Sequence, residues 1–134
     1  MFPSPTPIPT ISDERGSLAV AELGGALPFT AARSFVVFDP PGAIARGGHA
    51  HRACEQFLIA VGGSVAVTVD DGHQTQEYLL DSPSVGLHIP AGIWAEQRYP
   101  GPASRLLVLA SMPYDEADYI RDRSEYLRFR GLPA

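Results

Sequence analysis

Two histidines spaced two residues apart are the residues of this chain best suited to chemistry. His49 and His51 lie in the stretch Arg46–Phe57, directly before an apolar run that ends at Val61, so they are predicted to lie at the entry to a β-strand. Side chains at i and i+2 of a strand point to the same face, which aims both imidazoles into one space. Imidazoles titrate near neutral pH, so such a pair suits proton transfer or metal ligation. The competing interpretation is a histidine pair on a solvent-facing strand.

Two charged residues flank the histidine pair. Glu55 falls on the same face by parity if the strand stays regular. It would then either hold an imidazole tautomer or satisfy a buried donor. Arg46 precedes the pair and can bring a fixed positive charge to the same opening.

Short strands must position these residues. Val65, Val67 and Val69 alternate with Ala66 and Thr68, which is the two-residue period of a strand. Further strands are predicted over residues 18–23, 34–38, 57–61, 77–80, 85–89, 93–99 and 105–111. The segment 34–38 is apolar, aromatic and β-branched, and is predicted to be buried. Gly and Pro turns separate these segments, a pattern typical of an all-β sandwich or small barrel.

Only the C-terminal part of the chain has the features of a helix. Acidic residues suited to a helix start come first and basic residues suited to a helix end follow: Asp115, Glu116, Asp118, Arg121, Arg123 and Arg128. Tyr119, Ile120, Tyr126 and Leu127 could share one apolar face. We expect this helix to pack on the strands.

Length and composition limit the class of protein. The 134 residues fit a single domain spanning 1–134, with a proline-rich, extended segment over residues 1–10. The net charge of −5 and the lack of a basic block argue against a nucleic-acid partner. The chain has neither a signal-peptide pattern nor an apolar stretch of membrane-spanning length, so a cytoplasmic protein is expected. The single cysteine, Cys54, excludes an internal disulfide and is expected to be a small packed residue.

Two motifs resemble those of the cupins. The spacing His49-x-His51-x-x-x-Glu55 followed by Gly62 is similar to the first cupin motif, and residues 86–95, with a Pro-x-Gly turn, are similar to the second. In metal cupins the second motif supplies a third histidine, where this chain has Ala95. His49, His51 and Glu55 could together still bind a metal, although the missing ligand argues against it.

The resemblance extends to one family of cupins, the sugar 3,4-ketoisomerases, which act on dTDP-4-keto-6-deoxyglucose. It covers about residues 11–129 and includes the blocks 13–18, 46–51, 70–72, 80–87 and 109–121. The resemblance implies an all-β cupin jelly-roll barrel with a short C-terminal helix, a homodimer, and catalysis without a metal or other cofactor. It also implies a cytoplasmic enzyme of deoxysugar biosynthesis. Phe35 and Val36 stand where family members carry two tyrosines, and Ala95 stands where many carry a histidine.

The chemistry of this family suggests roles for the residues. Moving a ketone from C4 to C3 requires removal of the C3 proton and delivery of one to C4 through an enediol. We assign His51 as the proton shuttle by analogy and His49 as its partner on the sugar oxygens. Arg33 and Arg46 are predicted to bind the diphosphate, because guanidinium groups bind phosphate in bidentate fashion, and Arg15 is a third candidate.

Two aromatic residues complete the predicted substrate site. Trp94 would stack on thymine or form the floor of the sugar pocket, and the alternative is a place in the core. His88 is a weaker candidate for lining the cavity.

Three alternative functions differ in class. The first is a nucleotide-sugar 3,5-epimerase, which pairs a histidine with a tyrosine acid in a longer chain. The second is a cupin that binds a sugar nucleotide without turnover, an alternative that the missing tyrosines and Ala95 keep open. The third is a metal-dependent cupin oxygenase, which Ala95 disfavours.

Overall fold

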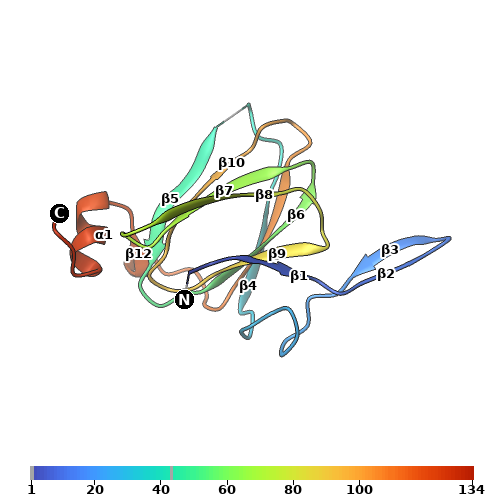
Figure 1. Cartoon of the computed structure of the whole chain (residues 1–134), viewed down its shortest axis with the longest axis horizontal. Helices are drawn as coiled ribbons and strands as arrows, with labels where there is room; N and C mark the ends of the chain where they lie inside the picture. Colours follow the sequence, from blue (N-terminus) through green and yellow to red (C-terminus); the bar gives the residue numbers. More distant parts are fainter. Residues whose placement is uncertain (1, 43) are drawn as a thin grey trace.

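The computed structural model describes residues 2–42 and 44–134 as two facing antiparallel sheets with a projecting hairpin and a short helix (Figure 1). The prediction of an all-β jelly-roll architecture with a C-terminal helix is confirmed. The two sheets form an open sandwich and do not close into a barrel. Among the described residues, no helix is long and apolar enough to cross a membrane.

Each large sheet has five strands. The first has the order β1 (Pro5–Pro7), β9 (Val85–Ile89), β6 (Gln56–Gly62), β11 (Arg105–Ala110) and β4 (Arg33–Val37). The second has the order β12 (Tyr119–Ile120), β5 (Ala45–His51), β10 (Trp94–Arg98), β7 (Val65–Asp70) and β8 (Thr75–Leu80). Strands β2 (Thr10–Asp13) and β3 (Gly16–Ala19) pair only with each other, and their hairpin extends away from both sheets (Figure 1).

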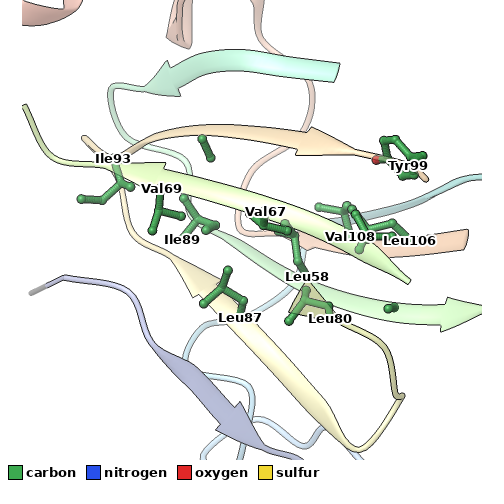
Figure 2. Packing of buried hydrophobic residues seen from close by; sticks show 13 residues of the cluster. Leu58, Val67, Val69, Leu80, Leu87, Ile89, Ile93, Tyr99, Leu106 and Val108 are labelled. Atoms are coloured by element: carbon green, nitrogen blue, oxygen red, sulfur yellow. The ribbon is translucent and has the colours of Figure 1, made fainter. Parts of the chain in front are cut away.

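The main core fills the space between the two sheets. Its residues come from alternate positions of the strands, as the alternation of β7 predicts: Val65, Val67 and Val69 are fully buried. Facing them are Leu58 and Val108 from the other sheet (Figure 2). A second cluster, with Phe29, Phe57 and Ile59, covers the outer face of the first sheet. The inner faces of the two sheets therefore face each other, and any cavity between them is lined by residues of both sheets.

The prediction that residues 34–38 are buried is wrong. Strand β4 lies at the edge of the first sheet, where Phe35 keeps 38% and Val36 keeps 48% of its surface exposed. An apolar composition cannot distinguish a central strand from an edge strand, because strand order is set by distant pairing.

The predicted helix begins later than expected. Glu116–Asp118 form one 3₁₀ turn, β12 follows, and the helix α1 (Arg123–Phe129) begins after Asp122, whose side chain accepts a hydrogen bond from the Glu125 N–H. Tyr119 and Ile120 pair with His51 and Ala50 of β5, so both lie in a sheet and on no helical face. Tertiary pairing here overrides a local charge pattern that suits a helix.

Candidate active site

A cavity of about 230 Å³ lies between the two sheets and is lined by residues of β4 and β5, among others. Its lining combines polar groups from the second sheet and the C-terminal segment with apolar groups from the first sheet. The lining residues are Phe35, Val37, Arg46, Gly47, His49, Gln56, Gln97, Tyr99, Leu106, Val108, Tyr119 and Arg121. A concave space with a few convergent polar groups is the usual form of a small-molecule site.

A bulge in β5 allows Arg46 and His49 to face the same cavity. Residues three apart in a regular strand point to opposite faces. In β5 the register with β10 shifts, because His49 is opposite Ala95 whereas Gly47 is opposite the next residue, Glu96, which leaves Gly48 as the extra residue. Gly47 and Gly48 have φ of +82° and +68°, which favours glycine at both positions, and a Cβ on Gly47 would lie 3.0 Å from the Ala95 carbonyl oxygen.

The two imidazoles form an aromatic cluster with Tyr119. The rings of His49 and His51 are 5.0 Å apart and edge to face, and the Tyr119 ring lies 5.0 Å from His49 and 4.4 Å from His51. The prediction that both histidines occupy one space is confirmed. His49 lines the cavity, whereas His51 is buried beside it and only 5% exposed.

Asp118 orients the imidazole of His51. His51 Nδ1 lies 2.9 Å from Asp118 Oδ2, and both side chains are buried. The same carboxylate accepts hydrogen bonds from the N–H groups of Ala53 (2.7 Å) and Cys54 (3.2 Å). A carboxylate is an acceptor, so the proton of the neutral ring sits on Nδ1, and Nε2 carries the lone pair. That Nε2 is buried and has no hydrogen-bond partner in the protein.

Both imidazoles are neutral at neutral pH. Burial, helped by the neighbouring His51, lowers the pKa of His49 to about 4. Burial also lowers the pKa of His51, although the Asp118 carboxylate acts in the opposite direction. A neutral imidazole with a free lone pair is a base, and Asp118 would stabilise the imidazolium formed when His51 takes a proton.

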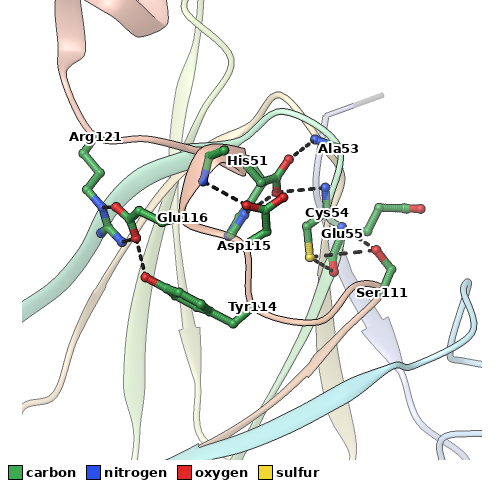
Figure 3. A network of polar contacts seen from close by, with 11 residues as sticks. His51, Ala53, Cys54, Glu55, Ser111, Tyr114, Asp115, Glu116 and Arg121 are labelled. Atoms are coloured by element: carbon green, nitrogen blue, oxygen red, sulfur yellow. Dashed lines mark hydrogen bonds and ion pairs between the residues drawn. The ribbon is translucent and has the colours of Figure 1, made fainter.

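Three arginines bring positive charge to this region. Arg46 and Arg121 line the cavity, and Glu116 holds Arg121 through two contacts of 3.0 and 3.1 Å. Figure 3 shows this pair beside Tyr114, which also donates a hydrogen bond to Glu116. Arg33 begins β4 with its guanidinium over the rings of Phe35 and Tyr114, and its buried Nε has no partner. The cavity is therefore suited to an anionic ligand.

Glu55 and His88 lie outside the cavity. Strand β5 ends at His51, and the loop that follows breaks the parity on which the position of Glu55 depended. Glu55 accepts a hydrogen bond from His88 Nε2 at 2.7 Å. His88 alternates with the buried Leu87 and Ile89 of β9, so it points to the outer face, where its ring is 5.9 Å from that of Phe29. The predicted roles of these residues in the catalytic cavity are therefore not supported.

Trp94 and Arg15 are also placed away from the cavity of the same chain. Trp94 alternates with the inward-facing Ala95 and is partly buried against Tyr126 of α1, with ring centroids 5.3 Å apart. Arg15 lies at the tip of the β2–β3 hairpin, with 85% of its side chain exposed, and pairs with Asp13.

One buried trio could hold a metal ion. Donor atoms of His51, Cys54 and Asp118 all lie within 4.8 Å of one another. Asp118 is already hydrogen-bonded to His51 Nδ1 and to two backbone N–H groups, so a metal would have to replace these bonds. The alternative set of His49, His51 and Glu55 is not assembled, because Glu55 contacts His88. Ala95, in the third-ligand position, lies directly opposite His49.

Four residues near the cavity were not recognised from the sequence as site residues: Tyr99, Asp118, Tyr119 and Arg121. The last three fall in the segment that was predicted to be a helix. The resemblance of block 109–121 to one family was the only signal that could have indicated them, and Tyr99 had none.

Comparison with known proteins points to one family. The model of the family described as "FdtA: WxcM-like, C-terminal" matches residues 4–131. The chain is 41% identical over 119 residues to the TDP-4-oxo-6-deoxy-alpha-D-glucose-3,4-oxoisomerase of Aneurinibacillus thermoaerophilus, which covers 89% of this chain and 86% of that protein.

Solved structures of 3,4-ketoisomerases have the same fold as this chain. A 3,4-ketoisomerase from Helicobacter canadensis superposes with a TM-score of 0.92 at 36% identity, over 98% of each chain. A mutant of the 3,4-ketoisomerase QdtA from Thermoanaerobacterium thermosaccharolyticum, in complex with TDP-4-keto-6-deoxyglucose, has a TM-score of 0.91 at 32% identity, over 96% of this chain and 94% of that one.

Proposed function

The chain belongs to the sugar 3,4-ketoisomerase family, and we propose that it moves the keto group of dTDP-4-keto-6-deoxyglucose from C4 to C3. The observation that carries this proposal is the buried His51–Asp118 pair beside His49 at the cavity. The reaction needs a base for a carbon-bound proton and a second group for the sugar oxygens, and two neutral imidazoles supply both.

The geometry favours His51 as the base. Its Nε2 takes the C3 proton, while its Nδ1–H stays hydrogen-bonded to the Asp118 carboxylate and offsets the new positive charge. The electrons of the broken C3–H bond form the C3–C4 double bond, while the electrons of the C4 carbonyl π bond move onto its oxygen. That oxygen takes a proton from His49 to complete the enediol, and His49 later regains one from the C3 hydroxyl. His51 then returns a proton to C4, and the C3 hydroxyl loses its proton as the C3 ketone forms. His49 serves the transfer between the oxygens, and no atom is gained or lost.

The direct test is the identification of the product. The purified protein incubated with dTDP-4-keto-6-deoxyglucose should yield a 3-keto product in NMR spectra. Inversion at C3 or C5 with the ketone still at C4 would favour an epimerase. Binding of the substrate without any change would favour the non-catalytic cupin.

We predict that catalysis is independent of metal. Ala95 stands where metal cupins place a third histidine, and Glu55 contacts His88 in place of the histidine pair. Prolonged chelation should leave the turnover rate unchanged. Loss of activity on chelation, followed by recovery with one divalent ion, would contradict this prediction and direct attention to His51, Cys54 and Asp118.

We predict that Arg46 and Arg33 bind the diphosphate. Replacing either with Ala should weaken dTDP binding in calorimetry by about 1.5–3 kcal/mol, the range for hydrogen bonds to charged groups. Arg98→Ala is the matched control, because Arg98 is an exposed neighbour that contacts Glu77 and Glu96 on the surface. Unchanged affinity in both variants would remove these arginines from the site. Arg121 then becomes the leading candidate, since it also lines the cavity.

The homodimer remains a proposal, supported by exposed apolar surface. Ile11 and Leu18 are opposite each other on the β2–β3 hairpin and are 64% and 60% exposed, on an arm that extends away from both sheets (Figure 1). Covering them with a second copy would remove apolar surface from water. In such a dimer Arg15 would serve substrate binding only by reaching the cavity of the partner.

Sedimentation measures this proposal directly. The wild-type chain should sediment as a dimer, and Ile11→Asp with Leu18→Asp should shift it to a monomer. A monomeric wild-type chain would exclude the dimer and, with it, a role for Arg15.

A cytoplasmic location is likewise proposed on the basis of the nucleotide-sugar substrate.

A further inference from the structure

Four buried side-chain atoms in the described part of the chain have no hydrogen-bond partner. They are Arg33 Nε, His49 Nδ1, His51 Nε2 and the hydroxyl oxygen of Tyr99. An unpaired buried polar group costs free energy, so each such group calls for an explanation. The first three belong to residues already assigned to the proposed site. The Tyr99 hydroxyl belongs to none of the residues with an assigned role.

Tyr99 directly follows β10 and continues the alternation of that strand, which directs its side chain into the cavity. Ala95, Gln97 and Tyr99 are two residues apart, and all three face the inside of the sandwich, where Gln97 and Tyr99 line the cavity. The side chain is only 1% exposed and packs at the end of the main core (Figure 2). Its hydroxyl is therefore held in place in a site that solvent barely reaches.

The surroundings of Tyr99 indicate what its hydroxyl could bind. Tyr99, Arg46 and Val37 line both the cavity and an adjacent hollow under the connection from β4 to β5. Phe35, on the opposite wall, offers no hydroxyl. Burial raises the pKa of Tyr99 to about 12 even though Arg46 acts in the opposite direction. The phenol is thus protonated at physiological pH and can donate a hydrogen bond beside a fixed positive charge.

We propose that Tyr99 is a substrate-binding residue whose hydroxyl donates a hydrogen bond to a diphosphate oxygen of the nucleotide sugar, next to Arg46. This inference rests on the proposed function, because it needs a nucleotide diphosphate in the cavity. With the sugar at His49 and the diphosphate at Arg46, two adjacent parts of the ligand contact two polar groups that line the same cavity. The ligand then supplies the acceptor that the free protein lacks.

Because the Tyr99 hydroxyl has no hydrogen-bond partner, we expect Tyr99→Phe to cost no stability. In the free protein the hydroxyl has no partner, so its removal should leave the unfolding temperature unchanged or raise it. Tyr78→Phe is the matched control, because the hydroxyl of this half-buried tyrosine donates to the Pro3 carbonyl at 2.8 Å. That variant should lower the unfolding temperature and leave ligand binding unchanged.

Calorimetry with dTDP and with thymidine tests the proposal. Tyr99→Phe should bind dTDP about 10- to 100-fold more weakly, as expected for a lost hydrogen bond to a charged group, and should bind thymidine as the wild type does. Unchanged dTDP affinity would overturn the proposal. An equal loss for dTDP and thymidine would also overturn it, since that result would indicate a general effect on the site.

The same experiment separates this inference from the proposed function. If the wild-type chain does not bind dTDP, the proposed function fails before Tyr99 is tested. If the wild type binds dTDP and forms the 3-keto product, while Tyr99→Phe binds dTDP equally well, only the assignment of Tyr99 fails.

Discussion

Replacing His51 with Asn should abolish isomerisation and leave dTDP binding intact. A general acid or base contributes about 10²–10⁴-fold in rate, so turnover should fall by at least the lower figure. The asparagine cannot take a proton from carbon, but it keeps a polar side chain beside Asp118. Measurements of kcat by NMR and of dTDP affinity by calorimetry would show the two effects separately.

Hydrogen exchange at C3 is the sharper test of His51. The variant should also stop exchanging the substrate C3 proton with deuterated solvent, since exchange requires abstraction even when reprotonation fails. His49→Asn should slow turnover and can retain exchange, because His49 is assigned to the oxygens. Wild-type exchange in His51→Asn would show that another group is the base. His49 is then the leading alternative, because Glu55 and His88 lie outside the cavity.

Replacing Asp118 with Asn should cost nearly as much activity as replacing His51. The amide can present an N–H to His51 Nδ1, which forces the ring proton onto Nε2 and removes the lone pair from the cavity side. One amide oxygen remains to accept the short Ala53 N–H bond, and only the longer Cys54 N–H bond, to the oxygen that the amide nitrogen replaces, is lost. The fold and the dTDP affinity should therefore be preserved. We expect turnover to fall by about 10²-fold or more, the scale of a lost general base.

The pH profile distinguishes positioning of His51 from a merely structural role of Asp118. The carboxylate raises the pKa of His51 against the lowering effect of burial. Loss of its charge should lower that pKa further, so the residual activity should persist to lower pH than in the wild type. Asp115→Asn is the matched control, because Asp115 is exposed and caps only the Ala117 N–H in the same turn. An Asp118→Asn variant with wild-type rate and pH profile would exclude the proposed pair.

Local sequence features are sufficient to predict most of the strands. The valine alternation of β7 was read correctly because a strand with one buried face must alternate every two residues. The same parity placed His49 and His51 together, because only two residues separate them.

The two-residue alternation does not predict the face of a side chain correctly where a strand is interrupted, or where the sequence does not show which face is buried. Glu55 was assigned to the histidine face, but β5 ends at His51 and the next residues form a loop held by Asp118. Arg46 shares a cavity with His49 only because the bulge at Gly48 reverses the alternation. The side chains of Trp94 and His88 cannot be placed from the sequence, because a single strand does not show which of its faces will be covered.

The sequence by itself determined the family, the all-β class and the pair of imidazoles, because these depend on motifs and on contacts between near neighbours in the chain. The tertiary structure alone decided that Asp118 orients His51, a contact between residues 67 apart that exists because β12 pairs with β5. It also placed Tyr99 and Arg46 on one cavity and paired Glu55 with His88 outside that cavity. Such contacts depend on strand order, register and bulges, which are set by the packing of the whole chain and not by any one segment.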